Sequence, residues 1–279
     1  MTKAAEQLYV SQSSLSYYLS KLEQEIGTPL FIRAKNGLIP TPAGEMYIES
    51  AKEVVGIKER LYQNIMNMEN QTHISISTTS YWGIQLFADI IPCFRTTFPN
   101  VTFSLSQIDV ANLKKEVLNG TVDIALMSVS SLDELDNMTE VLRKEELLFA
   151  VPASHPYVRS HPGDTITIRG FFNNFANETF LISRKGSANR DVFEELFSDW
   201  SNISPRICEI TGIPLTTNIV ATGIGVALVP ASGRFKEDLV HYYYFVPGLY
   251  RYNIMIHRKN LVLNTPEQAF FNLVKNYFH

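Results

Sequence analysis

The chain has 279 residues, of which 45% are hydrophobic, and a formal net charge of −4 at pH 7. This length can bury at least one sizeable core, and the mildly acidic balance is not that of a strongly basic, nonspecific nucleic-acid binder. No apolar run is long enough to span a membrane, and the first residues show no secretory h-region. Cys93 and Cys208 lack metal-type spacing, which predicts reduced cytoplasmic thiols, and the apolar neighbours of Cys93 argue against a redox-sensing thiolate.

Residues 4–31 carry the spacing of two short helices joined by a tight turn. The apolar positions of the two helices are Ala4, Ala5 and Leu8, and then Leu15, Leu19, Leu22 and Ile26. Ser11 stands where an N-cap belongs, and Gly27 ends the second helix. This pattern predicts a helix-turn-helix whose second helix begins with hydrogen-bonding side chains, the part of a recognition helix that meets base edges. A three-helix domain of another function can carry the same pattern.

A short basic turn at residues 33–37 follows, and a further helix is predicted to begin at Pro42. This pattern indicates a wing followed by a helix. Through AAExLxVSQxxLSxxLxxLExEIGxxLFxR and TxAGE, the run resembles the winged DNA-binding domain of the LysR-type transcriptional regulators. We expect base contacts from the helix and phosphate contacts from the wing. The candidate DNA-binding residues are Ser11, Gln12, Ser13, Ser14, Ser16, Tyr17, Tyr18, Lys21, Arg33 and Lys35.

Two features depart from the family pattern. In the family a further helix precedes the AAxxL helix, whereas Met1 stands only three residues before Ala4 here. We therefore expect an incomplete core and fraying of residues 1–41, because the start is mis-assigned or truncated or because this DNA-binding domain is weakened. In addition, Tyr17 or Tyr18 occupies a position that is commonly basic in the family, which removes a charge from the phosphate contacts.

Residues 42–71 predict a linker helix that dimerises. Their apolar positions follow a heptad-like spacing: Tyr47, Ala51, Val54, Leu61, Ile65 and Met68, with a second line at Ile48, Val55 and Tyr62. An amphipathic helix lying on its own domain is the alternative. Because residues 1–41 carry a net charge of only +1, one domain alone would hold DNA weakly, and we expect a homodimer or homotetramer on linked half-sites.

From His73 onward strands alternate with helices. ISIST, a helix over 84–97, VTFSLSQI, a helix over 112–118 and DIALMSV form a βαβαβ succession, which predicts a parallel sheet. ELLFAVP is interpreted as a strand crossing to a second lobe. That lobe contains FLISRKGSANRDVFEELF, RICEIT, a helix over 215–221 and GVALVP, and the chain returns through YNIMIHRK and a helix over 266–278.

FPNVTFSL, NGTVDIALM, ASHPY and ATGIGVALVP resemble the LysR-type effector domain, which is similar to periplasmic solute-binding proteins. The predicted fold class is α/β, in three parts. Residues 1–41 form a partial winged helix-turn-helix, 42–71 a long linker helix and 72–279 a two-lobed effector domain. Lobe I covers about 72–147 and 246–279, and lobe II about 148–245.

Hydroxyl-bearing residues gather at the predicted strand ends. Helix N-termini meet there, and their unpaired backbone N–H groups favour anions, which predicts a polar cleft for a small, anionic effector. The candidate effector-binding residues are Thr78, Thr79, Ser80, Gln107, Ser128, Ser183, Thr211 and Gly212. For any one of them, helix capping is the alternative. Tyr81 and Trp82 are candidates for the cleft wall, and Arg184 is either a carboxylate partner or an exposed loop residue.

The sequence lacks HExxH, GxSxG and P-loop motifs. We therefore expect no enzyme, no catalytic or metal-binding residues and no cofactor, and we interpret Asp123 and His155 as turn residues. The resemblance implies a cytoplasmic transcriptional regulator that binds double-stranded operator DNA, contacts RNA polymerase and binds no membrane. Its lobes would close on the effector and change the spacing of the DNA-binding domains. The alternative is a ligand-binding regulator that has lost autonomous DNA binding through N-terminal truncation.

Overall fold

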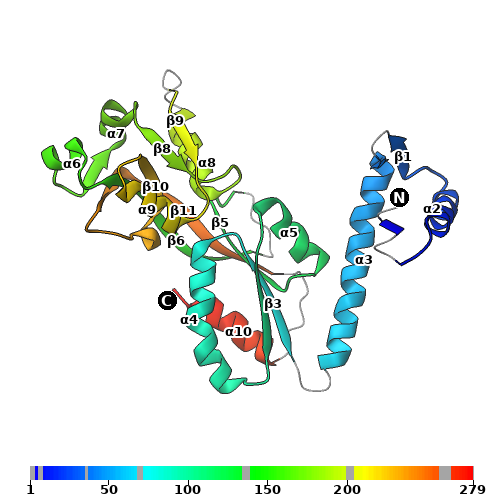
Figure 1. Cartoon of the computed structure of the whole chain (residues 1–279). Coiled ribbons are helices and arrows are strands. Elements are labelled where there is room, and N and C mark those ends of the chain that lie inside the picture. Colours follow the sequence, from blue (N-terminus) through cyan, green and yellow to red (C-terminus); the bar gives the residue numbers. More distant parts are fainter. Residues whose placement is uncertain are drawn as a thin grey trace. The chain divides into compact units, whose positions relative to one another are not determined.

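The structure is a computed structural model of the whole chain (Figure 1). It describes residues 4–5, 9–34, 37–67, 72–133, 139–198, 204–257 and 265–278. Contacts divide the chain into two compact units, residues 1–62 and 63–279. Within the described ranges, every helix is too short or too polar to cross a bilayer. The residue limits predicted for the linker helix and the two lobes stay predictions.

Helix α2 (Gln12–Ile26) has the predicted caps at both ends. The Ser11 hydroxyl accepts a hydrogen bond from the Ser14 backbone N–H at 3.0 Å. Gly27 closes the helix in the left-handed region, with φ at 80°, which an amino acid with a side chain rarely adopts. No residue of α2 is fully buried, and Leu8 lies outside the described residues.

The predicted wing is an antiparallel hairpin of β1 (Phe31–Ala34) and β2 (Gly37–Pro40). Glu23 on α2 ties the hairpin to the recognition helix. Its carboxylate accepts hydrogen bonds from the backbone N–H groups of Leu30 at 2.7 Å and Phe31 at 3.0 Å. This carboxylate therefore fixes where the wing leaves α2.

Helix α3 (Pro42–Asn67) begins behind the wing, as predicted. The Thr41 hydroxyl accepts a hydrogen bond from the Gly44 backbone N–H at 3.0 Å. A Cβ atom on Gly44 would lie 1.9 Å from the Leu30 carbonyl oxygen, so the helix start packs too closely for any side chain there. Met68 and the side chain of Ile65 lie outside the described residues. Large apolar side chains of α3 are exposed, namely Met46, Tyr47, Val54, Val55, Ile57, Leu61 and Tyr62.

The predicted βαβαβ succession is present in the second unit. Its elements are β3 (His73–Thr78), α4 (Tyr81–Thr97), β4 (Thr102–Gln107), α5 (Val110–Asn119) and β5 (Ile124–Val129). Strand β3 pairs in parallel with β4 and with β5. Asp123 lies in the bend directly before β5, as expected of a turn residue, and its carboxylate accepts hydrogen bonds from the Ser75 backbone N–H and hydroxyl, which hold that bend against β3. These elements, together with α10 (Thr265–Asn276), are called lobe I below.

Two long antiparallel strands connect the lobes. They are β6 (Thr139–Pro152) and β11 (Val240–His257), and they pair along most of their length. The end of β11 also pairs with β5, and its middle pairs with β7 (Thr165–Thr167). The sequence predicted only the last part of β11, because Pro247 interrupts the aromatic run. In the structure that interruption is a register shift rather than the end of the strand.

The remaining elements form lobe II (Figure 1). In chain order they are α6 (Pro156–Ser160), β7, α7 (Ile168–Phe175), β8 (Thr179–Ile182), α8 (Ala188–Ser198), β9 (Arg206–Glu209), α9 (Ile213–Ala221), β10 (Val226–Pro230) and η1 (Ala231–Gly233). Helices α6 and α7 and strand β7 were not predicted. His155 caps α6, in agreement with its interpretation as a turn residue. Phe171, Phe172 and Phe175 of α7 are buried in the core of the lobe.

Nine strands of the described chain form one sheet, in the order β4-β3-β5-β11-β6-β10-β8-β9, with β7 on β11. In lobe I, α4 and α10 pack on each other, and Trp82, Phe94 and Phe270 share one core with β3 and β5. Cys93 and Cys208 are free thiols. Cys93 is exposed, so the apolar setting expected for it from its sequence neighbours is wrong. The helix turns that side chain away from the core.

Candidate functional site

A cavity of about 300 Å³ lies between lobe I and lobe II, at the ends of β3, β5 and β8. Seven of the eight candidate effector residues line it: Thr79, Ser80, Gln107, Ser128, Ser183, Thr211 and Gly212. Tyr81, Trp82 and Arg184 line it as well. The strand-end rule therefore brought together side chains that are up to 133 positions apart in the sequence.

Thr78 does not line the cavity, which corrects its place among the candidates. It is fully buried, and its hydroxyl donates to the carbonyl oxygens of Leu126 at 3.0 Å and Ser80 at 3.1 Å. Thr78 is the last residue of β3, and the two residues after it, Thr79 and Ser80, line the cavity. Thr78 fixes the turn between β3 and α4, and Thr79 lies on the cavity side.

Four helices begin at the cavity. The first residues of α4, α5, α8 and α9 all contribute to its lining. The N-cap residues of α4 and α9, Ser80 and Gly212, form no side-chain capping bond, and neither helix has an acidic residue in its first turn. Backbone N–H groups and the helix dipole at such ends favour a bound anion.

A buried ion pair lies beneath the cavity. Glu145 on β6 faces Arg251 on β11 in the strand register, and both side chains are almost completely buried. The Arg251 Nη2 and Nε groups donate to Glu145 Oε2 at 2.8 and 3.0 Å. The other oxygen, Oε1, accepts a hydrogen bond from the Ser232 backbone N–H at 3.0 Å.

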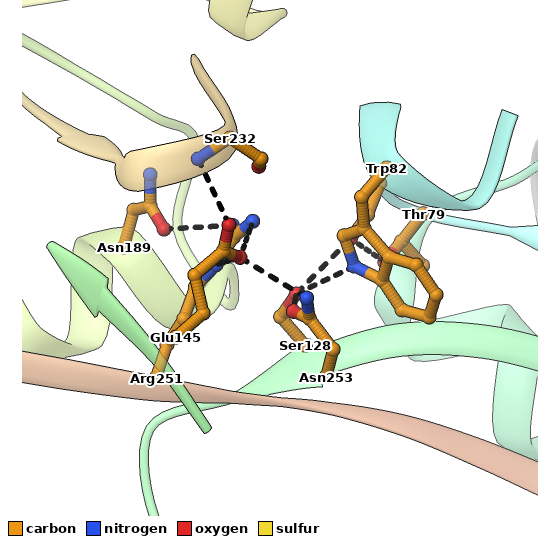
Figure 2. A network of polar contacts seen from close by, with 9 residues as sticks. Thr79, Trp82, Ser128, Glu145, Asn189, Ser232, Arg251 and Asn253 are labelled. Carbon is orange, nitrogen blue, oxygen red and sulfur yellow. Dashed lines mark hydrogen bonds and ion pairs between the residues drawn. The ribbon is translucent and has the colours of Figure 1, made fainter. Parts of the chain in front are cut away.

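Further hydrogen bonds carry this network into both lobes. Toward lobe I, Asn253 Nδ2 donates to Glu145 at 3.0 Å, the Ser128 hydroxyl donates to Asn253 at 2.8 Å, and the Trp82 indole donates to Ser128 at 3.0 Å. Toward lobe II, Arg251 Nη1 donates to Asn189 Oδ1 at 3.0 Å. Figure 2 shows these side chains together on β5, on the two connecting strands and on the adjoining helices.

The charges of this pair nearly cancel. Burial by itself raises the pKa of Glu145, but the Arg251 charge and the hydrogen bonds from Ser232 and Arg251 outweigh it, so the pKa lies below its ordinary value. Burial lowers the pKa of Arg251, and Glu145 opposes that shift. The guanidinium stays protonated at neutral pH. Arg184 is therefore the cation of the lining whose charge Glu145 does not neutralise, and none of the described lining residues is Asp or Glu.

The side-chain amide of Asn189 has a hydrogen-bond donor without a partner among the described residues. It lies in the first turn of α8, lines the cavity and is 5% exposed. Its Oδ1 atom accepts from Arg251, whereas its Nδ2 group is buried and has no hydrogen-bond partner among the described residues. A buried donor without a partner destabilises a protein by about 1–3 kcal/mol. Such a group therefore requires an explanation.

An aromatic contact joins the two lobes beside the cavity. Tyr81 at the start of α4 in lobe I meets Phe235, which follows η1 in lobe II, with ring centroids 5.8 Å apart and the planes at 87°. Edge-to-face aromatic pairs of this kind contribute about 0.5–1.5 kcal/mol beyond their buried area. This pair thus links the two lobes directly at the cavity.

A neighbouring cavity of about 420 Å³ has the opposite electrostatic character. It shares Val110 and Ser128 with the first cavity but contains the carboxylates of Asp133 and Asp191 and no arginine or lysine among its described lining residues. The pKa of Asp191 is raised by burial and by Glu194. An anion is therefore better accommodated in the first cavity. Among the described residues, no cluster of His, Cys, Asp or Glu could hold a metal ion.

Sequence reasoning missed Glu145, Asn189, Ser232, Arg251 and Asn253. Their proximity depends on the register of β6 and β11, which local sequence patterns do not reveal. One signal was available. Arg251 is the one Lys, Arg, Asp or Glu in residues 240–257, and a buried charge is normally paired, but its partner Glu145 stands among other charged residues at 143–146 and gave no such signal.

The described candidate DNA-binding residues lie at the N-cap of α2, along α2 as far as Lys21, and at Arg33 on β1. Gln12, Ser13 and Ser14 are exposed, Ser16 is half-buried, and Lys21 is exposed. Tyr17 and Tyr18 are each 65% exposed. The Ser11 hydroxyl is within 2.8 Å of the Ser13 and Ser14 hydroxyls, so it serves the cap. Lys35 and the side chain of Arg33 lie outside the described residues. The first turn of α2 has no acidic residue, which suits a phosphate.

Residues 68–279 match the LysR substrate binding domain, and residues 1–45 match the bacterial regulatory helix-turn-helix proteins of the lysR family. Two uncharacterized HTH-type transcriptional regulators of Bacillus subtilis (strain 168) are similar. YcgK is 27% identical over 98% of this chain and 88% of its own length. YybE is 30% identical over 82% of this chain and 77% of its own length.

Solved structures show the same fold. Full-length CbnR complexed with its target DNA aligns with a TM-score of 0.64 at 21% identity, over 100% of this chain and 94% of that one. A full-length OxyR variant from Pseudomonas aeruginosa aligns with a TM-score of 0.64 at 21% identity, over 99% and 88% of the two chains.

Proposed function

This chain belongs to the LysR family of bacterial regulatory helix-turn-helix proteins and is a transcriptional regulator with an effector-binding domain, and we propose that a small, anionic effector bound in the cavity between its lobes controls its output. The observation that carries the proposal is the lining of that cavity. It combines hydroxyls, four helix starts and Arg184, and its described lining contains no carboxylate. The neighbouring cavity, with Asp133 and Asp191, would repel the same ligand.

The effector would act by favouring one arrangement of the two lobes. Thr79 and Ser128 belong to lobe I, whereas Ser183 and Thr211 belong to lobe II, so one ligand could contact both. A ligand shifts a conformational equilibrium only by its difference in affinity for the two states. Contacts that exist only when the lobes are closed supply that difference. The β6 and β11 strands, which both lobes share, are where the change in lobe angle would be transmitted.

The N-terminal unit would bind the DNA. The exposed polar start of α2 fits a major groove, and the β1–β2 hairpin is the wing that supplies phosphate contacts. The exposed apolar residues of α3, among them Val54 and Leu61, are suited to pairing with a second copy. A dimer or tetramer would then bind linked half-sites, and a change in their spacing would alter DNA bending and contact with RNA polymerase.

A gel-shift assay tests this proposal. Purified full-length chain is titrated onto the DNA upstream of its own gene, with shuffled DNA of equal composition as the control. We expect a discrete complex on the upstream DNA that weakens with salt and changes when small carboxylates are added. A folded chain that binds carboxylates but forms no complex would contradict autonomous DNA binding. A complex unaffected by every anion would contradict control by an anionic effector.

A further inference from the structure

Asn189 has only one orientation that its surroundings accept. Its Oδ1 atom receives the Arg251 Nη1 proton at 3.0 Å. Rotating the amide by half a turn would place its two donors against a guanidinium that has donors only. The guanidinium cannot turn away, because its Nε and Nη2 groups are bound to Glu145. The amide donor therefore stays on the side away from Arg251.

The Asn189 Nδ2 donor is almost completely excluded from solvent. Asn189 is 5% exposed, and its Nδ2 group has no partner among the described residues. The same side chain lines the cavity. A buried donor in a binding site discriminates strongly, because a ligand without a matching acceptor leaves it unpaired.

We propose that Asn189 is a specificity-determining residue, whose Nδ2 group donates a hydrogen bond to a carboxylate oxygen of the effector. This inference rests on the proposed function and names the chemical class of its ligand. A monocarboxylate matches the charge of the site, because Glu145 neutralises Arg251 and Arg184 is left to balance a single negative charge. Phosphate, which carries more charge, fits this balance less well.

The experiment replaces the donor and keeps the acceptor. In Asn189→Asp the side chain still presents an oxygen to Arg251 but no longer donates, and it adds a negative charge. Asn189→Ser keeps a shorter hydroxyl and serves if the aspartate variant does not fold. The matched control is Asn173→Asp, the same substitution at an exposed position of α7 outside the cavity lining.

The probes are small aliphatic and aromatic monocarboxylates, the primary amides of the same carbon skeletons, and inorganic phosphate. Thermal shift of the full chain selects the carboxylate that binds most tightly, and calorimetry then measures its affinity and that of its amide for each variant. Circular dichroism establishes that each variant is folded.

We expect Asn189→Asp to bind the carboxylate probe at least about tenfold more weakly, and to prefer the matching amide, which can donate to the new carboxylate. Asn189→Ser should weaken carboxylate binding about fivefold or more without reversing the preference, and Asn173→Asp should bind as the unmodified chain does. Unchanged carboxylate affinity in Asn189→Asp, or in Asn189→Ser if only that variant folds, overturns the role of Asn189. Phosphate binding more tightly than every carboxylate overturns the ligand class. If no anion binds the unmodified chain, the proposed function fails, and this inference fails with it.

Discussion

Replacing Glu145 by glutamine tests whether the buried network both stabilises the effector-binding unit and limits its positive charge. The side chain of Glu145 is fully buried and that of Arg251 is 7% exposed, so solvent screens their interaction little. Removing one partner of a buried ion pair destabilises a protein by about 3–5 kcal/mol. Glutamine keeps one acceptor oxygen for either Arg251 or Ser232, so we expect a loss of about 2–4 kcal/mol. For a unit of this size, that lowers the melting temperature by roughly 5–15 °C.

The assay is thermal and urea unfolding followed by circular dichroism, with Glu140→Gln as the control. Glu140 lies on the same strand and pairs with Lys275 at 3.0 Å, but both side chains are substantially exposed, so its loss should change stability by less than about 1 kcal/mol. Because Glu145→Gln leaves the Arg251 charge uncompensated beside the cavity, the carboxylate probe should bind that variant more tightly than the unmodified chain. Equal melting temperatures for the two variants, or weaker probe binding to Glu145→Gln, would refute this reasoning.

Three further predictions concern pH, the cavity and the recognition helix. The folded-state pKa of Glu145 is lowered from its ordinary value of 4.5, so its stabilisation is fully present above that pH and is lost as the pH falls below it; the difference in unfolding free energy between the unmodified chain and Glu145→Gln should stay constant from neutral pH down to the ordinary glutamate pKa and shrink below it. Thr79→Val removes one cavity hydroxyl at constant volume and should lower the calorimetric affinity for the carboxylate probe by roughly 1–2 kcal/mol, and an unchanged affinity would remove Thr79 from the site. Gln12→Ala should relax base preference in a footprint, whereas Lys35→Ala in the wing sequence should weaken binding to all sequences alike and flatten its salt dependence; a base preference that survives Gln12→Ala would contradict the first assignment.

Local sequence patterns predicted a structural feature correctly where that feature depends on a single element or on the general geometry of parallel strands. Ser11 and Gly27 predicted the ends of α2, because capping depends on neighbouring residues. The hydroxyls at the ends of β3 and β5 were found because these parallel strands carry their C-terminal ends to one edge, whereas β8 runs the opposite way in the sheet and ends at the cavity from lobe II. Which of Thr78 and Thr79 faces the cavity was not decided, since a shift of one residue exchanges the two faces of a strand.

The register between strands that are distant in the sequence could not be predicted from local sequence patterns. The Glu145–Arg251 pair depends on two strands that are separated by 87 residues between Pro152 and Val240. The α6–β7–α7 segment was missed because its elements are short and the two asparagines at 173–174 interrupt an aromatic cluster. The unpaired donor of Asn189 follows from the orientation of Arg251, so it could be recognised only after the network had been placed.

The central claim is that an anion bound between the lobes changes DNA binding, and a coupled titration tests it most directly. The complex with the DNA upstream of the gene is titrated with the carboxylate probe, for the unmodified chain and for Thr79→Val. We predict that the probe concentration giving half of the DNA response rises in Thr79→Val by about five- to thirtyfold, the same factor as the calorimetric dissociation constant. A DNA response that does not follow the affinity of the cavity, or no response to any probe that binds there, would contradict the account.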